Sequence, residues 1–253
     1  MEVVRREGYQ FCQELLVPCY QTDERTVLRP ASFMDMAQEI AYWAAQELGF
    51  GYDTLHIHHK AWVLSRMHIR FLAPPRWRDA VKLYTWHKGT SGLFYLRDFV
   101  LLGPQGETAV TCTSSWVVID EQSRHLVRPE EFQELLQVGE VADAIKEPAP
   151  KVSVPAKAGD APVSLPEPAG EHRVAFSDLD IVGHTNNARY VVWAMDCLPL
   201  DVANQSLKDL IINFNKECLP GERVQLYRLH AGNAWYVEGR VDGKSCFTVK
   251  MEY

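Results

Sequence analysis

The sequence lacks long apolar runs. No stretch of its 253 residues approaches the length of a membrane span, and the first ten residues, MEVVRREGYQ, contain no apolar core of a secretory signal. We therefore expect a protein that neither crosses a membrane nor is exported, and we place it in the cytoplasm.

The chain also lacks an excess of positive charge and any close pair of cysteines. With 26 Lys and Arg against 33 Asp and Glu, its formal net charge is −7, which argues against nucleic acid as a partner. The six cysteines are scattered without a C-x-x-C pair, which favours reduced thiols over a disulfide or zinc framework.

Several signatures of other enzyme classes are missing. No G-x-S-x-G motif occurs, which argues against an α/β-hydrolase, and neither a phosphate loop nor a dinucleotide fingerprint is present. The run HIHH at 56–59 has no accompanying cysteine or acidic ligands, so we interpret it as a solvated loop. We expect no cofactor and no metal.

What the chain does contain is a weak internal repeat. Two pairs of segments match without gaps and in the same order, which predicts a duplicated unit. The matched segments are His68–Trp86 with Ile211–Leu229, and Thr22–Phe33 with Leu179–Tyr190.

Each predicted unit has one helix followed by strands. Apolar residues spaced i, i+3, i+4, i+7 follow Phe33 in the first unit and Tyr190 in the second, whereas residues 247–253 alternate as a half-buried strand does. Turn signals at 103–106 and 241–245 predict hairpins. The pattern indicates an α+β fold in which an antiparallel sheet wraps one helix, twice in tandem: a double hotdog.

These patterns give a domain division. We expect an N-terminal hotdog at 1–146 that binds the substrate's apolar part, a proline-rich linker at 147–170 and a C-terminal hotdog at 171–253 that carries the chemistry.

The two copies disagree in chemical type at a few aligned positions. The second copy has polar or reactive residues where the first has mostly apolar or rigid ones. These residues are His184, Asn186, Asn187, Glu217 and Cys218, and they accompany Asp180, which both copies have (Asp23 in the first). Alone, Asp180 would read as a turn residue, His184 as a satisfied histidine, Glu217 as a solvated strand end and Cys218 as a small buried hydrophobe.

The segments SDLDIVGHTNNARYVVW (177–193) and NFNKECLPGERV (213–224) resemble the acyl-acyl carrier protein (acyl-ACP) thioesterases, double-hotdog enzymes that release fatty acids from their carrier. The resemblance places the family's Asp on Asp180, its His on His184 and its Glu-Cys on Glu217 and Cys218. It departs at Val182, where the family has Asn, so either Asn186 or Asn187 supplies that amide or this chain works without it.

The resemblance implies hydrolysis of a thioester. We expect Glu217 to polarise water, His184 to orient it or to protonate the leaving thiolate, and Asp180 to fix the histidine or bind the water. The first amides of the helix near Asn187 would hold the oxyanion. The alternative makes Cys218 a covalent nucleophile activated by His184.

The implied partner is acyl carrier protein, with the chain a monomer or homodimer. Because the carrier is acidic, docking would need basic residues, and we expect them in the segment 66–78, at Arg76 and Arg78 above all. Two other functions stay open: a hotdog thioesterase for acyl-CoA and a non-catalytic acyl-binding module.

Overall fold

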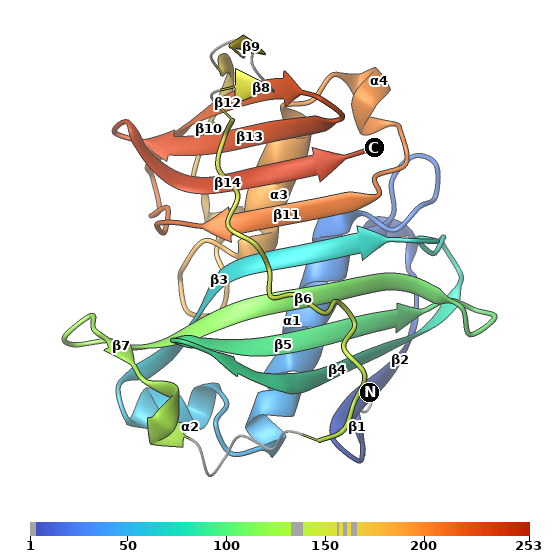
Figure 1. Ribbon diagram of the computed structural model, residues 1–253, viewed down its shortest axis with the longest axis vertical. Coiled ribbons are helices and arrows are strands. Elements are labelled where there is room, and N and C mark those ends of the chain that lie inside the picture. The colour runs from blue at the N-terminus through green and yellow to red at the C-terminus, as the bar shows by residue number, and fades with distance from the viewer. Residues whose placement is uncertain (1–3, 133–138, 156, 159–160, 163–165) are drawn as a thin grey trace. The chain divides into compact units, whose positions relative to one another are not determined.

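The computed structural model describes residues 4–132, 139–155, 157–158, 161–162 and 166–253, and the chain divides into two compact units, Met1–Ala149 and Pro150–Tyr253 (Figure 1). Residues 156, 159–160 and 163–165 of the expected linker lie outside the described residues. Within that span, β8 (Lys157–Ala158) pairs with β9 (Ala161–Pro162), and the last four residues already belong to strand β10. In the described part, no helix has the length and apolar character to cross a membrane.

The N-terminal unit is an antiparallel sheet packed on one long helix. The strand order is β1-β2-β4-β5-β6-β3, with β7 paired to β6. Its strands are β1 (Arg5–Glu7), β2 (Gln10–Leu16), β3 (Lys60–Phe71), β4 (Ala80–Ser91), β5 (Phe94–Leu102), β6 (Thr108–Asp120) and β7 (Leu126–Val127). Its helices are η1 (Cys19–Gln21), α1 (Pro30–Glu47), α2 (Tyr52–Ile57) and η2 (Pro129–Phe132).

Helix α1 begins with Pro30, whose fixed φ and missing N–H suit a first helical position. The predicted apolar face is confirmed, because Phe33, Ala37 and Ile40 are fully buried and Leu48, just after the helix, is partly buried. Helix α1 packs against β4, where Leu83 is fully buried, and against β2. The alternating core therefore forms on the sheet surface that faces the helix.

The C-terminal unit repeats the plan with fewer strands. The order is β11-β14-β13-β12-β10, all antiparallel, and α3 packs against β13 and β14 (Figure 1). The elements are β10 (Glu167–Arg173), η3 (Phe176–Asp178), α3 (Asn187–Asp196), α4 (Leu200–Ala203), β11 (Asp209–Phe214), β12 (Arg223–Ala231), β13 (Ala234–Val241) and β14 (Lys244–Glu252). The α+β fold with two hotdog units is confirmed.

The core of the C-terminal unit follows the predicted patterns. Phe247, Val249 and Met251 are fully buried at alternate positions of β14, but Thr248 between them is buried too, so this part of the strand is covered on both faces, and Tyr253 lies beyond its end. Tyr190 and Trp193 present the buried face of α3. The hairpin between β13 and β14 turns at Asp242 and Gly243, which both have positive φ, as a two-residue hairpin turn requires.

A segment from residue 139 to 149 runs across the outer side of the N-terminal sheet (Figure 1). It is held by a buried ion pair on the sheet. Lys88 Nζ lies 3.3 Å from Asp98 Oδ2 and donates to Ile145 O at 2.6 Å, while the same carboxylate accepts Ala144 N–H at 2.8 Å. Burial raises the pKa of Asp98, against the opposing effects of Thr113 and Lys88.

Candidate active site

The candidate site starts from a tight turn built by Asp180. Its backbone N–H donates to His184 O at 2.8 Å, and its Oδ1 accepts both Val182 N–H and His184 N–H at 3.0 Å. Gly183, at φ 79°, takes the left-handed conformation that closes the turn. Asp180 therefore fixes the backbone from which the His184 side chain projects.

The N-terminal unit contains the same turn. Asp23 N–H donates to Val27 O at 2.8 Å, and Asp23 Oδ1 accepts Arg25 N–H at 2.8 Å and Val27 N–H at 2.9 Å. Thr26, at φ 64°, stands where the second turn has Gly183. The duplication predicted from sequence is thus visible as one hydrogen-bond pattern built twice.

The two turns differ in what the second carboxylate oxygen meets. Asp23 Oδ2 accepts from the Arg25 guanidinium at 2.8 and 3.1 Å. Among the described residues we find no donor to Asp180 Oδ2. The turn network uses one oxygen of Asp180 and leaves the other available.

His184 and Glu217 come together at the surface of the C-terminal unit. His184 Nδ1 lies 3.5 Å from Glu217 Oε1, with side-chain exposures of 55% and 28%. Glu217 Oε1 is itself buried and accepts no hydrogen bond from the described residues. A buried carboxylate oxygen without a hydrogen bond keeps unused acceptor capacity, and the His184 imidazole lies beside it.

Cys218 points away from this surface. Its side chain is fully buried, and a hydrogen bond with the Cys246 thiol, together with burial, raises the pKa of the Cys218 thiol above its usual value. A thiol that is neutral and inaccessible is a poor nucleophile.

The helix that follows begins with the two asparagines. Asn186 is the N-cap of α3, and its Oδ1 accepts Ala188 N–H at 2.8 Å, while Arg189 N–H donates to Asn186 O at 2.9 Å. The helix start expected to offer several amides therefore uses two of them internally. Asn187 N–H is the amide of this turn for which the described residues provide no acceptor.

Asp178 anchors the segment that leads into α3. Its carboxylate, 1% exposed, accepts Ala175 N–H at 2.8 Å and pairs with His172 at 2.8 Å and with Arg189 at 3.0 Å. Burial alone would raise the pKa of Asp178, but these three hydrogen bonds outweigh it and hold the pKa below its ordinary value. Its backbone O accepts Asn186 N–H at 2.9 Å, which ties the anchor to the helix cap.

Two further residues hold the Glu217–Cys218 segment, and sequence reasoning missed both. Thr185 Oγ1 donates to Cys218 O at 2.6 Å, and Cys218 N–H donates to Tyr190 Oη at 3.0 Å. The aligned residues of the first copy are Leu28 and Phe33. The sequence does hold a sign of this role, because the first copy has no hydroxyl at either position. The alignment of Phe33 with Tyr190, however, indicates a core position shared by both copies and not a hydrogen bond.

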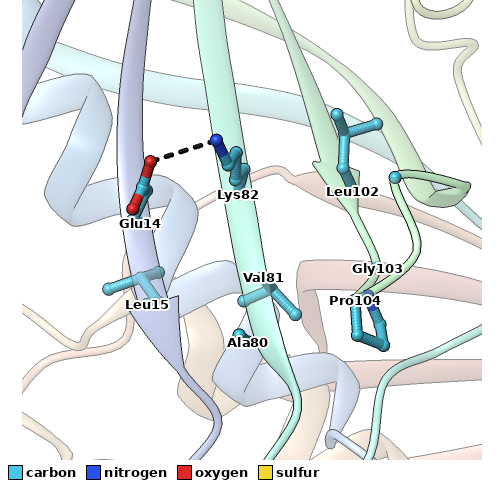
Figure 2. A pocket seen from close by; sticks show the side chains of 9 residues that line it. Glu14, Leu15, Ala80, Val81, Lys82, Leu102, Gly103 and Pro104 are labelled. Atoms are coloured by element: carbon cyan, nitrogen blue, oxygen red, sulfur yellow. Dashed lines mark ion pairs between the residues drawn. The ribbon is translucent and has the colours of Figure 1, made fainter.

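A surface hollow of about 350 Å³ lies elsewhere, on the N-terminal unit (Figure 2). It is lined by residues 14–15, 80–82, 102–104 and 106 of β2, β4 and the β5–β6 turn, and a Glu14–Lys82 ion pair of 3.1 Å crosses part of it. Both partners are half exposed, so the pair is solvent-screened. No predicted site residue lines this hollow.

Two family models match the chain. Residues 8–136 match the acyl-ACP thioesterase N-terminal domain, and residues 167–243 match the acyl-ACP thioesterase C-terminal domain. Among curated proteins, the chain is 25% identical over 234 residues to oleoyl-acyl carrier protein thioesterase 2 of Arabidopsis thaliana, covering 84% of this chain and 60% of that protein. It is 28% identical over 229 residues to a palmitoyl-acyl carrier protein thioesterase of Gossypium hirsutum, covering 84% of this chain and 53% of that one.

Solved structures share the fold at low identity. The 12:0-ACP thioesterase from Umbellularia californica superimposes with a TM-score of 0.83 at 20% identity and covers 98% of both chains. An acyl-ACP thioesterase from Bacteroides thetaiotaomicron gives 0.79 at 21% identity, covering 97% of this chain and 98% of that one. The chain spans about 60% or less of the length of the curated plant relatives named above. With both domain models matched in order, the chain belongs to the acyl-ACP thioesterase family.

Proposed function

We propose that this protein hydrolyses fatty acyl-acyl carrier protein to a free fatty acid and the carrier thiol, the reaction that ends fatty acid synthesis. The observation that carries the proposal is the approach of His184 Nδ1 to Glu217 Oε1, 3.5 Å apart. His184 ends a turn that the N-terminal unit builds with Val27 in its place. Family membership supplies the substrate class.

The chemistry balances as a simple hydrolysis. Glu217 takes a proton as water attacks the thioester carbonyl carbon, the tetrahedral oxyanion collapses, and the carbon–sulfur bond breaks. Glu217 then gives this proton to the leaving thiolate, either directly, with His184 orienting the water, or through His184, and the carrier leaves as a thiol. Asp180 fixes His184 through its backbone and offers its free carboxylate oxygen to the water.

The oxyanion would be held at the start of α3. Asn187 N–H has the position and the helix dipole for this role. Val182, which is 40% exposed and apolar, replaces the amide that the family has there. The side-chain amide of Asn186 or Asn187 is the substitute we propose.

Direct attack by water is favoured over a Cys218 nucleophile. The Cys218 thiol is fully buried, and its pKa lies above the usual value, whereas Glu217 is 28% exposed beside His184. These observations support a carboxylate-based mechanism.

The N-terminal unit is proposed to bind the acyl chain, since its copy of the turn lacks the reactive residues. The unit boundaries predicted at 146 and 171 stay predictions, as does a cytoplasmic location, while the curated plant relatives are named as chloroplastic.

Of the two arginines expected to dock the carrier, Arg76 is engaged within the N-terminal unit and Arg78 is exposed. Arg76 Nη1 donates to Arg25 O at 2.8 Å, so this guanidinium also supports the turn. The Arg78 guanidinium lies over the Trp77 ring, 4.1 Å from its centroid, in an exposed position. Arg78 is therefore the better docking candidate of the two.

Release of free thiol from matched substrates tests the proposal. The chain should cleave acyl-ACP with a higher kcat/KM than acyl-CoA of the same chain length. A preference for acyl-CoA would make it an acyl-CoA thioesterase. Binding of both substrates without thiol release would make it a non-catalytic acyl-binding module.

A further inference from the structure

The backbone of Cys218 is clamped from both sides by hydroxyl groups of the active-site turn and helix. Tyr190 Oη accepts its N–H at 3.0 Å, and Thr185 Oγ1 donates to its carbonyl at 2.6 Å. All three residues are buried, with exposures of 3% for Tyr190, 5% for Thr185 and 0% for Cys218. No solvent molecule can take over either bond at such a site without a rearrangement.

The first copy joins the equivalent turn and loop without hydroxyl groups. Pro75 aligns with Cys218 and has no N–H to satisfy, and Phe33, which aligns with Tyr190, has no hydroxyl to satisfy it. Leu28 N–H donates to Pro75 O at 2.8 Å, where the second copy uses the Thr185 side chain. The second copy has both the Cys218 N–H and the Tyr190 hydroxyl that accepts it, and the first copy has neither. The hydroxyl clamp therefore occurs only in the copy that carries the Glu-Cys pair.

The clamp acts on the residue next to it. Glu217 precedes Cys218 directly and lies beyond the end of β11. The backbone is tied to β14 as far as Lys216, whose N–H donates to Cys246 O at 3.0 Å, and the next backbone hydrogen bonds among the described residues are those of Cys218. Glu217 Oε1 nevertheless sits 3.5 Å from His184 Nδ1. The two hydroxyl bonds join the Glu217 segment to the turn and helix that carry His184.

We propose that Tyr190 and Thr185 are positioning residues that hold the Glu217 carboxylate in register with His184 through the Cys218 backbone. The inference rests on the proposed function and deepens it. Neither residue touches substrate. Their hydroxyls fix the distance between the base and its partner.

Tyr190→Phe is a clean probe because the ring itself is held by other contacts. It packs edge-on against Trp193, Phe214 and Phe247 at centroid distances of 5.1, 5.6 and 5.2 Å. Removing one oxygen therefore leaves the packing in place. Tyr236→Phe, a half-buried tyrosine on β13 of the same unit, is the matched control.

The experiment measures kcat and KM for acyl-ACP, well below the melting temperature and per folded protein. Tyr190→Phe and Thr185→Val should each lower kcat by about 10- to 100-fold with little change in KM, as displacement of a catalytic group does. Thr185→Ser keeps the hydroxyl and should restore most of kcat, and Tyr236→Phe should match the parent chain. Unchanged kcat in both Tyr190→Phe and Thr185→Val, in a parent whose Glu217→Gln variant is inactive, overturns the positioning role.

Amide hydrogen exchange separates this inference from the proposed function. In Tyr190→Phe the amides of 216–219 should exchange at least about tenfold faster than in the parent or in Tyr236→Phe, because the segment has lost an anchor. If the parent releases no thiol but the exchange result holds, the proposed function fails and the clamp stands. Unchanged exchange at 216–219 overturns the clamp whatever the activity.

Discussion

The two units build the same turn with different side chains on it. Asp23 and Asp180 accept equivalent pairs of backbone N–H groups, and the flanking contacts repeat as well, since Val17 N–H donates to Asp79 O and Val174 N–H donates to Glu222 O, both at 3.0 Å. Val27 is replaced by His184 at the end of the turn. The backbone pattern is therefore a requirement of the fold, and the side chains that it presents are free to change.

This comparison assigns two parts to Asp180. The oxygen that closes the turn is structural, because Asp23 does the same in a copy that has Val27 in place of His184 and Pro74 in place of Glu217. The other oxygen has no such counterpart, since in the first copy Arg25 occupies it. A residue can thus serve the fold and the chemistry through different atoms.

The largest expected effect comes from the base. Glu217→Gln should lower kcat by roughly a hundredfold or more, because an amide cannot take the proton from water. Steady-state thiol release checks this, with Glu171→Gln as control, since Glu171 forms an exposed pair with Arg223 at 2.7 Å in the same unit. If Glu217→Gln keeps most of its kcat, the base lies elsewhere.

The second prediction tests the comparison directly by making one change in both turns. Asp180→Asn and Asp23→Asn each keep an oxygen that can accept the two N–H groups, so both variants should melt within a few degrees of the parent. Activity should fall about a hundredfold in Asp180→Asn alone. Equal activity in the two variants would reduce Asp180 to a turn residue.

The third prediction concerns buried charge in the N-terminal unit. Burial, with Arg97 nearby, lowers the pKa of His87 to about 4, below the value of 6.5 for an exposed histidine. The unfolded chain therefore binds a proton between pH 6.5 and 4 that the folded chain does not, so stability is full above pH 6.5 and falls as the pH drops. From pH 7 to pH 5 this histidine should cost about 2 kcal/mol of unfolding free energy.

Denaturant titrations at several pH values measure this loss, and His87→Gln should remove most of it. His184→Gln is the control in the other unit, where the side chain is 55% exposed. An identical pH dependence in parent and His87→Gln would show that folding does not lower the pKa of His87.

The smallest effect is expected at Cys218. Cys218→Ser should lower kcat by less than about tenfold, because the thiol is buried and un-ionised and does not attack the substrate. Treatment of the folded parent with a thiol-alkylating reagent should leave Cys218 unmodified. Complete loss of turnover in Cys218→Ser, together with an active Glu217→Gln, would restore the covalent scheme.

The fold was predictable because repeated patterns report on burial. The helical spacing after Phe33 and Tyr190 and the alternation at 247–253 each describe a surface that must face a core. The repeat also located the turn, whose hydrogen bonds come from one Asp at each copy. The helical spacing, the strand alternation and the Asp turn depend on local sequence, so they can be recognised even when the two copies have diverged.

The finer geometry was not predictable from the sequence. The burial of Cys218 and the two hydroxyl bonds to its backbone join residues about 30 positions apart, and no local pattern encodes them. The helix start also differs from expectation, because Asn186 uses the Ala188 amide for its own cap. Which polar groups remain free at a site is decided by these tertiary contacts, and so the roles at Asp180, His184, Asn187 and Glu217 stay predictions.

The ion pair that holds the segment 139–149 sets a limit on where the chain can be shortened. Asp98 is fully buried, and its carboxylate depends on Lys88 and on Ala144 N–H, while Lys88 depends on Ile145 O. A fragment that stopped at the end of the last N-terminal strand would remove the Ala144 N–H from the Asp98 carboxylate and the Ile145 carbonyl from Lys88. Both charged groups would then be exposed to water. An N-terminal fragment that keeps this ion pair covered must therefore extend through Ile145, well past the last strand of the unit, and cleavage of the chain before Ala144 should destabilise the sheet.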